Sequence, residues 1–304
     1  MKKIILSLIG IFSFFFLCSC DKNVPAELVI MNEDKQEQTI KITTTENKDE
    51  LLVLLDQLKK AKLNPIQFSG VSLSITSKIR GKMSIGEEDK TNIDLNYDIR
   101  VDTIASLKKY ILSGKVTLEG YTKTDSLNLS LNAKQKLLAN VINDDDDNLY
   151  VNYSFETEGI KSKAKKKLDI SSFTEEYKIK IMNALDILKY YNPITLFPEL
   201  ESYVTAVSAT KKNSFTLKLS IPAENTFIDC FIELNCQNLM PIHFKINLDE
   251  VLIEELEREY LDKYVGQPVY VEDALFTIEA SLDYGNHSIM PLTEEEKATY
   301  SYFN

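Results

Sequence analysis

Strict alternation of apolar and polar residues, repeated in run after run, is the feature that most constrains the fold of this chain. It is clearest over residues 93–101 and 215–221, where each aliphatic or aromatic residue is followed by a polar one. A period of two places successive side chains on opposite faces of a strand. One apolar face and one wet face are typical of antiparallel sheets, so we predict half-buried antiparallel strands.

The same period recurs along most of the chain. We predict further strands over residues 71–79, 112–118, 127–131, 149–155, 228–234 and 276–282, and weaker candidates over 137–141, 203–207 and 242–248. Polar stretches at 122–125 and 222–225 are short enough to be hairpin turns.

Three segments change to a period of 3.6 and predict helices. The first begins at Asn47 and continues to residue 62; the second follows Ser172 and ends at Pro193; the third covers 250–264 and stops at Gly266. The order predicts an α+β fold in which helices pack against one face of a large antiparallel sheet. We expect a single domain over residues 47–304.

The amino terminus resembles a lipoprotein export signal. Two lysines precede an uncharged apolar stretch at 4–17, which is shorter than the roughly 20 residues that span a bilayer. Leu, Cys and Ser then precede Cys20, as in the lipobox of lipoprotein signal peptidase. We expect removal of residues 1–19, a lipid on Cys20 and a polar tether over 20–46; an ordinary secreted protein and an uncleaved anchor helix are the alternatives.

This N-terminus predicts an extracytoplasmic, membrane-anchored protein at the cell surface or in the periplasm. The net charge of −11 argues against nucleic acid as a partner, so the lipid is expected to supply the membrane attachment. Cys230 and Cys236 are the cysteines that remain, and their spacing leaves both a disulfide and two free thiols open.

Residues for catalysis are scarce. Only His243 and His287 are present, and no nucleophile elbow, zinc motif or phosphate-binding loop is found, so we predict neither an enzyme nor a cofactor. Four carboxylates at Asp144, Asp145, Asp146 and Asp147 form either a solvated acidic turn or a weak calcium site. The lysines over 161–167 indicate either a protected sheet edge or contact with anionic polymers.

Four features together resemble the LolA and LppX type of lipoprotein carriers and lipid-binding lipoproteins. They are the exported cysteine, the amphipathic helix after the tether, the long alternating segments over 68–81 and 111–121, and the helix that follows the first group of strands. The resemblance covers roughly residues 48–248. It implies an unclosed antiparallel barrel whose concave apolar face is covered by helices and holds acyl chains.

If the resemblance holds, inward side chains of the strands line a cavity and two helices cover it. The implied cavity residues are Leu95, Tyr97, Ile99, Leu129, Val151, Phe155, Leu217 and Leu219 on strands and Leu55, Leu58, Ile181 and Leu185 on helices. The expected function is non-catalytic binding or transport of an apolar ligand, an acyl chain of a lipid or lipoprotein. The alternative is a cell-envelope interaction module with a solid core that binds a protein or polymer.

Overall fold

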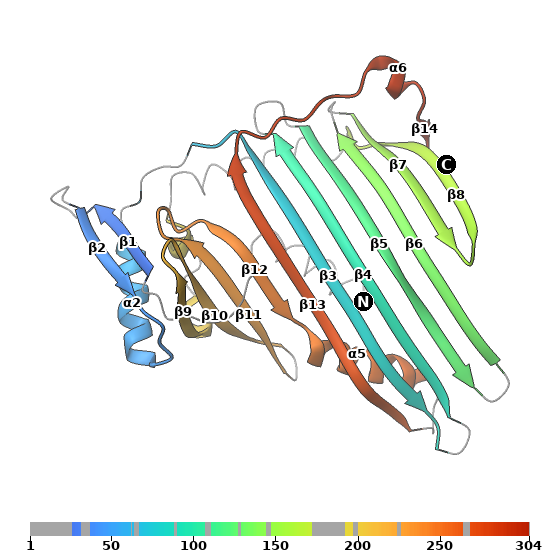
Figure 1. Ribbon diagram of the computed structural model, residues 1–304, viewed down its shortest axis with the longest axis horizontal. Helices are drawn as coiled ribbons and strands as arrows, with labels where there is room; N and C mark the ends of the chain where they lie inside the picture. The colour runs from blue at the N-terminus through green and yellow to red at the C-terminus, as the bar shows by residue number, and fades with distance from the viewer. Residues whose placement is uncertain are drawn as a thin grey trace. The chain divides into compact units, whose positions relative to one another are not determined.

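The computed structural model describes residues 26–31, 37–61, 63, 67–87, 90–106, 111–126, 129–143, 147–171, 192–196, 200–223, 226–263 and 268–303 (Figure 1). The expected signal peptide, Cys20, Asp144 to Asp146 and nearly all of the helix expected after Ser172 lie outside these ranges. The chain divides into two compact units, which are described in turn. The boundary of a single domain at residue 47 stays a prediction.

Unit 1 contains most of the N-terminal residues and a later group of strands. Its elements are β1 (Ala26–Met31), β2 (Glu37–Ile42), α2 (Lys48–Lys60), η1 (Pro193–Leu196), α4 (Leu200–Tyr203), β9 (Val204–Lys211), β10 (Ser214–Pro222), β11 (Phe227–Asn235) and β12 (Pro241–Asn247).

Unit 2 contains the longest strands. Its elements are β3 (Gly70–Ile85), β4 (Thr91–Ser106), β5 (Ile111–Ser126), β6 (Leu129–Asn143), β7 (Asn148–Thr157), β8 (Ile160–Asp169), α5 (Asp249–Lys263), most of β13 (Val269–Gly285), α6 (Glu294–Lys297) and β14 (Ser301–Tyr302).

Hydrogen bonding joins the strands into two sheets within the described residues. Strands β1 and β2 form one, and twelve strands form the other in the order β14-β8-β7-β6-β5-β4-β3-β13-β12-β11-β10-β9. The large sheet is unclosed. It is also mixed, since β14 runs parallel to β8, whereas the sequence predicted antiparallel pairing throughout.

The predicted first helix is confirmed as α2. The side chain of Asn47 accepts hydrogen bonds from the backbone N–H groups of Asp49 (3.0 Å) and Glu50 (3.3 Å), which caps the helix N-terminus. The other end is held from a distant part of the chain, because the amide of Asn192 donates to the carbonyls of Leu58 and Ala61. Helix α2 packs against β9 and η1 within unit 1.

The expected tether is wrong for residues 26–31 and 37–42, which form the β1–β2 pair. Ala26, Leu28, Ile40 and Ile42 alternate with exposed residues and are buried. Each of these strands is short, so its period was too brief to stand out from the polar residues around it.

Unit 2 is built around the consecutive antiparallel strands β3 to β8 (Figure 1). The strands predicted over 71–79, 93–101, 112–118, 137–141 and 149–155 are confirmed, and the structure extends them to as many as 16 residues. The strand predicted over 127–131 is confirmed only from Leu129, where β6 begins, because residues 127 and 128 lie outside the described ranges. The hairpin turn predicted at 122–125 is wrong, because β5 continues to Ser126 and these residues pair with both β4 and β6. Threonine and lysine are acceptable there because that end of the strand is half-exposed.

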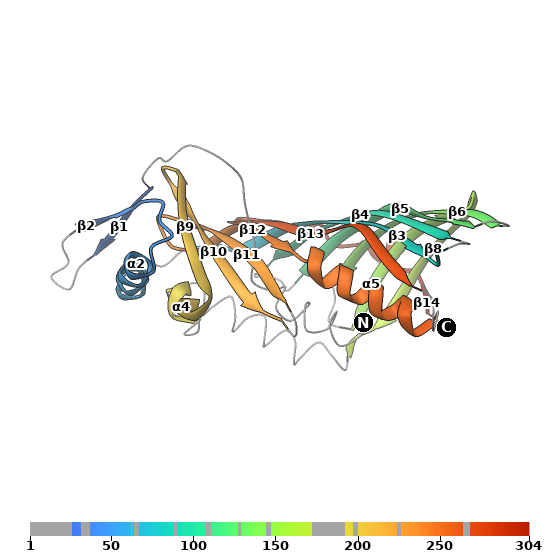
Figure 2. The ribbon, with the colours of Figure 1, turned by 90° about the horizontal axis from the view of Figure 1, so that it is seen from below.

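The predicted third helix is confirmed as α5, which lies along one face of the sheet in Figure 2. Leu256 forms a core cluster with Met83, Ile85 and Ile93, and Leu252 packs against it. Among the described helices, none is long and apolar enough to cross a membrane.

Candidate functional site

One face of β4 to β7 carries a continuous set of apolar side chains, which we call the apolar face. The strand register aligns Ile99 with Leu118, Leu118 with Leu137, and Leu137 with Phe155, which makes one row across four strands. Each of these four side chains is half-buried. A second row, Gly114–Val141–Val151, lies further along the same face.

The predicted cavity residues separate into two groups. Leu95, Tyr97, Ile99, Val151 and Phe155 all lie on the apolar face of unit 2, as the alternation predicted. Leu129 begins β6. Ile181 and Leu185 lie outside the described residues.

The other four belong to unit 1. Leu55 and Leu58 on α2 and Leu217 and Leu219 on β10 are at most 4% exposed. They belong to the buried residues of unit 1, which also include Phe215, and they are in a different unit from the other cavity residues. The structure therefore does not bring the predicted set together within one unit.

Sequence reasoning also missed members of the apolar face. Val116, Leu118, Leu137 and Val141 belong to it by register, although only strand membership was predicted for them. Period-two patterning shows which residues of one strand share a face, but the face of the neighbouring strand depends on the pairing register. That register is visible only in the structure.

Glycines leave gaps in the apolar face. Tyr97 pairs directly with Gly120, and its hydroxyl lies 2.7 Å from the Thr122 hydroxyl on the same strand as Gly120. A Cβ at Gly120 would lie 2.5 Å from Cδ1 of Tyr97. The tyrosine ring therefore occupies the space that a side chain would take, an arrangement in which an aromatic residue covers a strand glycine.

The opposite face of β4 to β7, which we call the polar face, carries a row of charged side chains of both signs. The register aligns Asp98, Glu119, Lys136 and Glu156, with Lys161 next on β8. Lys136 Nζ lies 2.8 Å from Glu119, and Lys161 Nζ lies 3.3 Å from Glu156. From β3, Arg80 donates two hydrogen bonds of 2.9 Å to Asp98.

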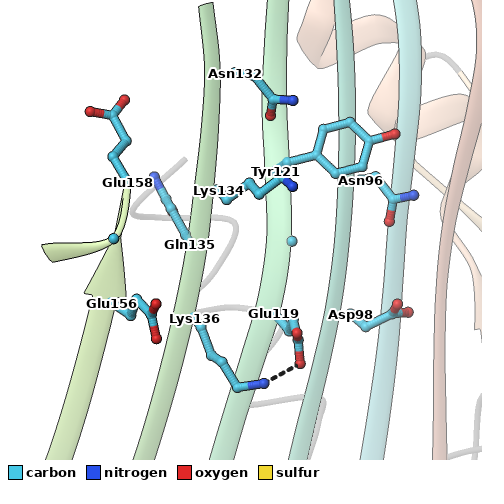
Figure 3. Close-up of a pocket in the computed structure, with 12 residues that line it drawn as sticks. Asn96, Asp98, Glu119, Tyr121, Asn132, Lys134, Gln135, Lys136, Glu156 and Glu158 are labelled. Atoms are coloured by element: carbon cyan, nitrogen blue, oxygen red, sulfur yellow. Dashed lines mark hydrogen bonds and ion pairs between the residues drawn. The ribbon is translucent and has the colours of Figure 1, made fainter. Parts of the chain in front are cut away.

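A polar hollow of about 560 Å³ lies on this face (Figure 3). It lies over β4 to β7, and its rim includes the β7–β8 turn, where Glu158 and Gly159 have φ of 49° and 81°. Two successive positive φ values are typical of the tight two-residue turn that favours glycine at its second position. Sequence reasoning missed this hollow, because it depends on which polar residues the register places side by side.

Several polar groups in the hollow have no side-chain partner within the described residues. These are the amides of Asn96 and Asn132, the ammonium of Lys134 and the carboxylate of Glu158. Tyr121 is held in place from one side, since its hydroxyl donates to Asp94 at 3.4 Å. In Figure 3 the Tyr121 ring extends toward Asn96, and Lys134 lies beside it.

The lysine-rich segment forms β8, the last long strand of the sheet. Beyond it the two residues of β14 pair with Lys166 and Lys167. Lys165 and Lys167 also lie over the rings of Tyr300 and Tyr302, 5.3 and 4.3 Å from their centroids. These lysines therefore lie on the strand next to the edge, which β14 pairs with only at two residues. Both interpretations, protection of the edge against further pairing and contact with anionic polymers, stay predictions.

The two cysteines are free and buried. Strand β11 is extended between them, so at about 3.3 Å per residue their Cα atoms are far beyond the separation that a disulfide spans. Burial raises the pKa of the Cys230 thiol to about 12 and that of Cys236 to about 11.

A charged group is buried near His243 in unit 1. Glu233 is 7% exposed; it accepts two hydrogen bonds from Lys211 (2.7 and 2.9 Å) and one from the Ser214 hydroxyl. Burial lowers the pKa of His243, against the opposing fields of Glu233 and Glu279. The ring Nε2–H of His287 donates to the carbonyl oxygen of Asp283, at 3.1 Å.

The described residues contain no group of three or more His, Cys, Asp or Glu side chains placed to hold a metal ion. Of the four aspartates in the weak calcium candidate, only Asp147 is described, and it is exposed just before β7. The calcium interpretation stays a prediction.

No protein-family model matches this chain, and neither a curated protein nor a solved structure is significantly similar to it. The resemblance to LolA and LppX carriers therefore stays a prediction.

Proposed function

We propose that this protein is an extracytoplasmic lipoprotein, anchored by a lipid on Cys20, that binds or carries an apolar ligand without catalysing a reaction. The single observation that supports it most is the row of half-buried apolar side chains across β4 to β7. An acyl chain laid on this face would gain about 0.8 kcal/mol for each methylene removed from water.

The proposal includes helices that cover a concave apolar face in an unclosed barrel. Helix α5 supports it, because Leu252 and Leu256 pack on the side of β3 and β4 where Ile93 and Leu95 lie. We propose that the helix expected after Ser172, which carries Ile181 and Leu185, adds to this cover and that the ligand is an acyl chain of lipid or lipoprotein.

Native mass spectrometry after expression in a lipid-containing host tests the carrier function. The protein should begin at Asp21, because β1 starts at Ala26 and its buried residues belong to the fold. We expect co-purified lipid and saturable uptake of a fluorescent fatty acid. Leu118→Gln should weaken uptake, whereas Thr117→Gln, on the polar face of the same strand, should not. A protein that takes up no apolar probe at any concentration contradicts the proposal.

Membrane attachment is tested separately by Cys20→Ser. The substitution removes the thiol that would carry the lipid, so the folded protein should move to the soluble fraction. The measurement is fractionation of cells followed by immunodetection. Continued retention in the membrane would show that Cys20 is not the anchor.

The polar hollow supports a second candidate, a cell-envelope interaction module. The observation that supports this function is the set of amides and charges on the polar face that have no side-chain partner among the described residues. They lie on the side of β4 to β7 opposite the apolar row. In this function the interior is solid, as the core of unit 1 is, and a protein or polymer binds from solvent. The two candidate functions use different faces. A substitution on the apolar face should therefore affect only the carrier function, and a substitution on the polar face only the interaction module.

A further inference from the structure

The charges of the polar hollow balance once its two ion-pair partners outside the lining, Arg80 and Lys161, are counted, although the whole chain carries a net charge of −11. Asp98 is paired with Arg80, Glu119 with Lys136, and Glu156 with Lys161. The charges that remain are those of Lys134 and Glu158, one of each sign. A ligand with a large net charge of either sign would therefore find little average attraction here, which favours a neutral ligand.

The unpartnered groups of the hollow define the chemistry of that ligand. Each of the amides of Asn96 and Asn132 offers an N–H₂ donor beside a carbonyl acceptor, and Lys134 and Glu158 add a donor and an acceptor. Adjacent hydroxyl groups on a ring present a donor and an acceptor in the same side-by-side way. A planar amide can therefore bond two neighbouring hydroxyls at once.

An aromatic ring completes the arrangement. Register places Asn96, Tyr121 and Lys134 in one row across β4, β5 and β6, and the hydroxyl of Tyr121 is held by Asp94. The C–H groups of a sugar ring pack on the flat face of a tyrosine while the hydroxyls reach polar neighbours. Mixed apolar and hydrogen-bonding surface of this kind orients a ligand as well as holding it.

We propose that the polar hollow is a binding site for a neutral saccharide chain, with Asn96 and Asn132 bonding its hydroxyls and Tyr121 packing on a ring. This inference deepens the second candidate function and does not depend on the carrier function. It names a glycan as the polymer partner, held on the polar face of unit 2.

Isothermal titration calorimetry of the full mature chain with cellohexaose, maltohexaose and mannohexaose tests the proposal. We expect one of these neutral oligosaccharides to bind with an affinity that is nearly the same in low and high salt, because screening affects charged ligands far more than neutral ones. Asn132→Ala should weaken binding about fivefold to tenfold, the effect of losing one or two hydrogen bonds. Tyr121→Ala should weaken it at least as much.

Asn140→Ala is the matched control, since Asn140 is an exposed asparagine on the same strand and face as Asn132 but outside the hollow. It should leave sugar affinity unchanged, and circular dichroism of each variant checks that the fold is kept. The proposal is overturned by any of three results: no heat with any of the three sugars at millimolar concentration, equal losses in Asn132→Ala and Asn140→Ala, or binding confined to a charged polymer or a peptide. Fatty-acid uptake, measured on the same variants, should be unaffected, so failure here is distinguishable from failure of the carrier function.

Discussion

The close approach of β4 to β5 at Gly120 makes a sharp prediction about stability. A Cβ at this position would lie 2.5 Å from Cδ1 of Tyr97 and 2.8 Å from its Cα, and still closer to the carbonyl oxygen of Asn96. Two of these three atoms belong to backbone, so rotation of the tyrosine side chain alone does not relieve the clash. Gly120→Ala should therefore force the two strands apart locally.

Gly114 provides an internal control on the same strand and the same face. A Cβ there would meet its nearest atoms, Oγ1 of Thr103 and the carbonyl oxygen of Asp102, at 3.7 and 3.8 Å, which is ordinary contact. Alanine restricts the unfolded chain more than glycine, so Gly114→Ala should stabilise by about 0.5–1 kcal/mol. Overpacking at Gly120 should cost about 1–3 kcal/mol, which leaves the two variants about 1.5–4 kcal/mol apart.

Urea denaturation followed by far-ultraviolet circular dichroism measures this difference. The midpoint should fall for Gly120→Ala and rise slightly for Gly114→Ala relative to the natural chain, with similar slopes. Equal shifts in the two variants, or a higher midpoint for Gly120→Ala, would refute the close strand approach on which the reasoning depends.

Three further predictions concern buried groups of unit 1. Because burial raises the pKa of both thiols to about 11 or 12, Cys230 and Cys236 should stay unreactive toward a thiol reagent at pH 8 until urea unfolds the protein, and reduction should leave the mass unchanged. Burial lowers the pKa of His243 in the folded protein below its unfolded value near 6.5. Around and below that pH the unfolded chain binds more protons than the folded one, so the free energy of unfolding falls as pH decreases. His243→Gln should flatten the dependence of the urea midpoint on pH between about 7 and 5; an unchanged slope would exclude this origin. Lys211→Ala should cost about 1–2 kcal/mol, because the carboxylate of Glu233 keeps the Ser214 hydroxyl but loses its cation. Glu233→Gln in the same chain should recover part of the loss, and thermal melts of both variants decide it.

Much of the secondary structure could be predicted from the sequence, because it depends on local patterns. The alternation around Leu95 and Leu217 identified strands, and the leucine stripe with its capping Asn47 identified α2. The β1–β2 pair was missed because each strand is only six residues long, among polar neighbours.

The candidate sites could be predicted only in part. Alternation assigned Ile99 and Phe155 to apolar positions, but the row between them needs Leu118 and Leu137, which the register supplies. The polar hollow was not predicted, because alternating polar residues on one strand give no sign of which charges on the next strand will neutralise them.

Local sequence patterns were enough to predict which residues alternate and where α2 and α5 form, and they also predict export and a lipid on Cys20. The tertiary structure decided that Leu55 and Leu217 belong to a packed core in one unit while Leu95 and Phe155 line a sheet face in the other. The physical reason is that strand and helix formation depends on neighbours along the chain. A face, a hollow or a core depends on pairing between segments distant in sequence, and a shift of one residue would move every side chain to the other side.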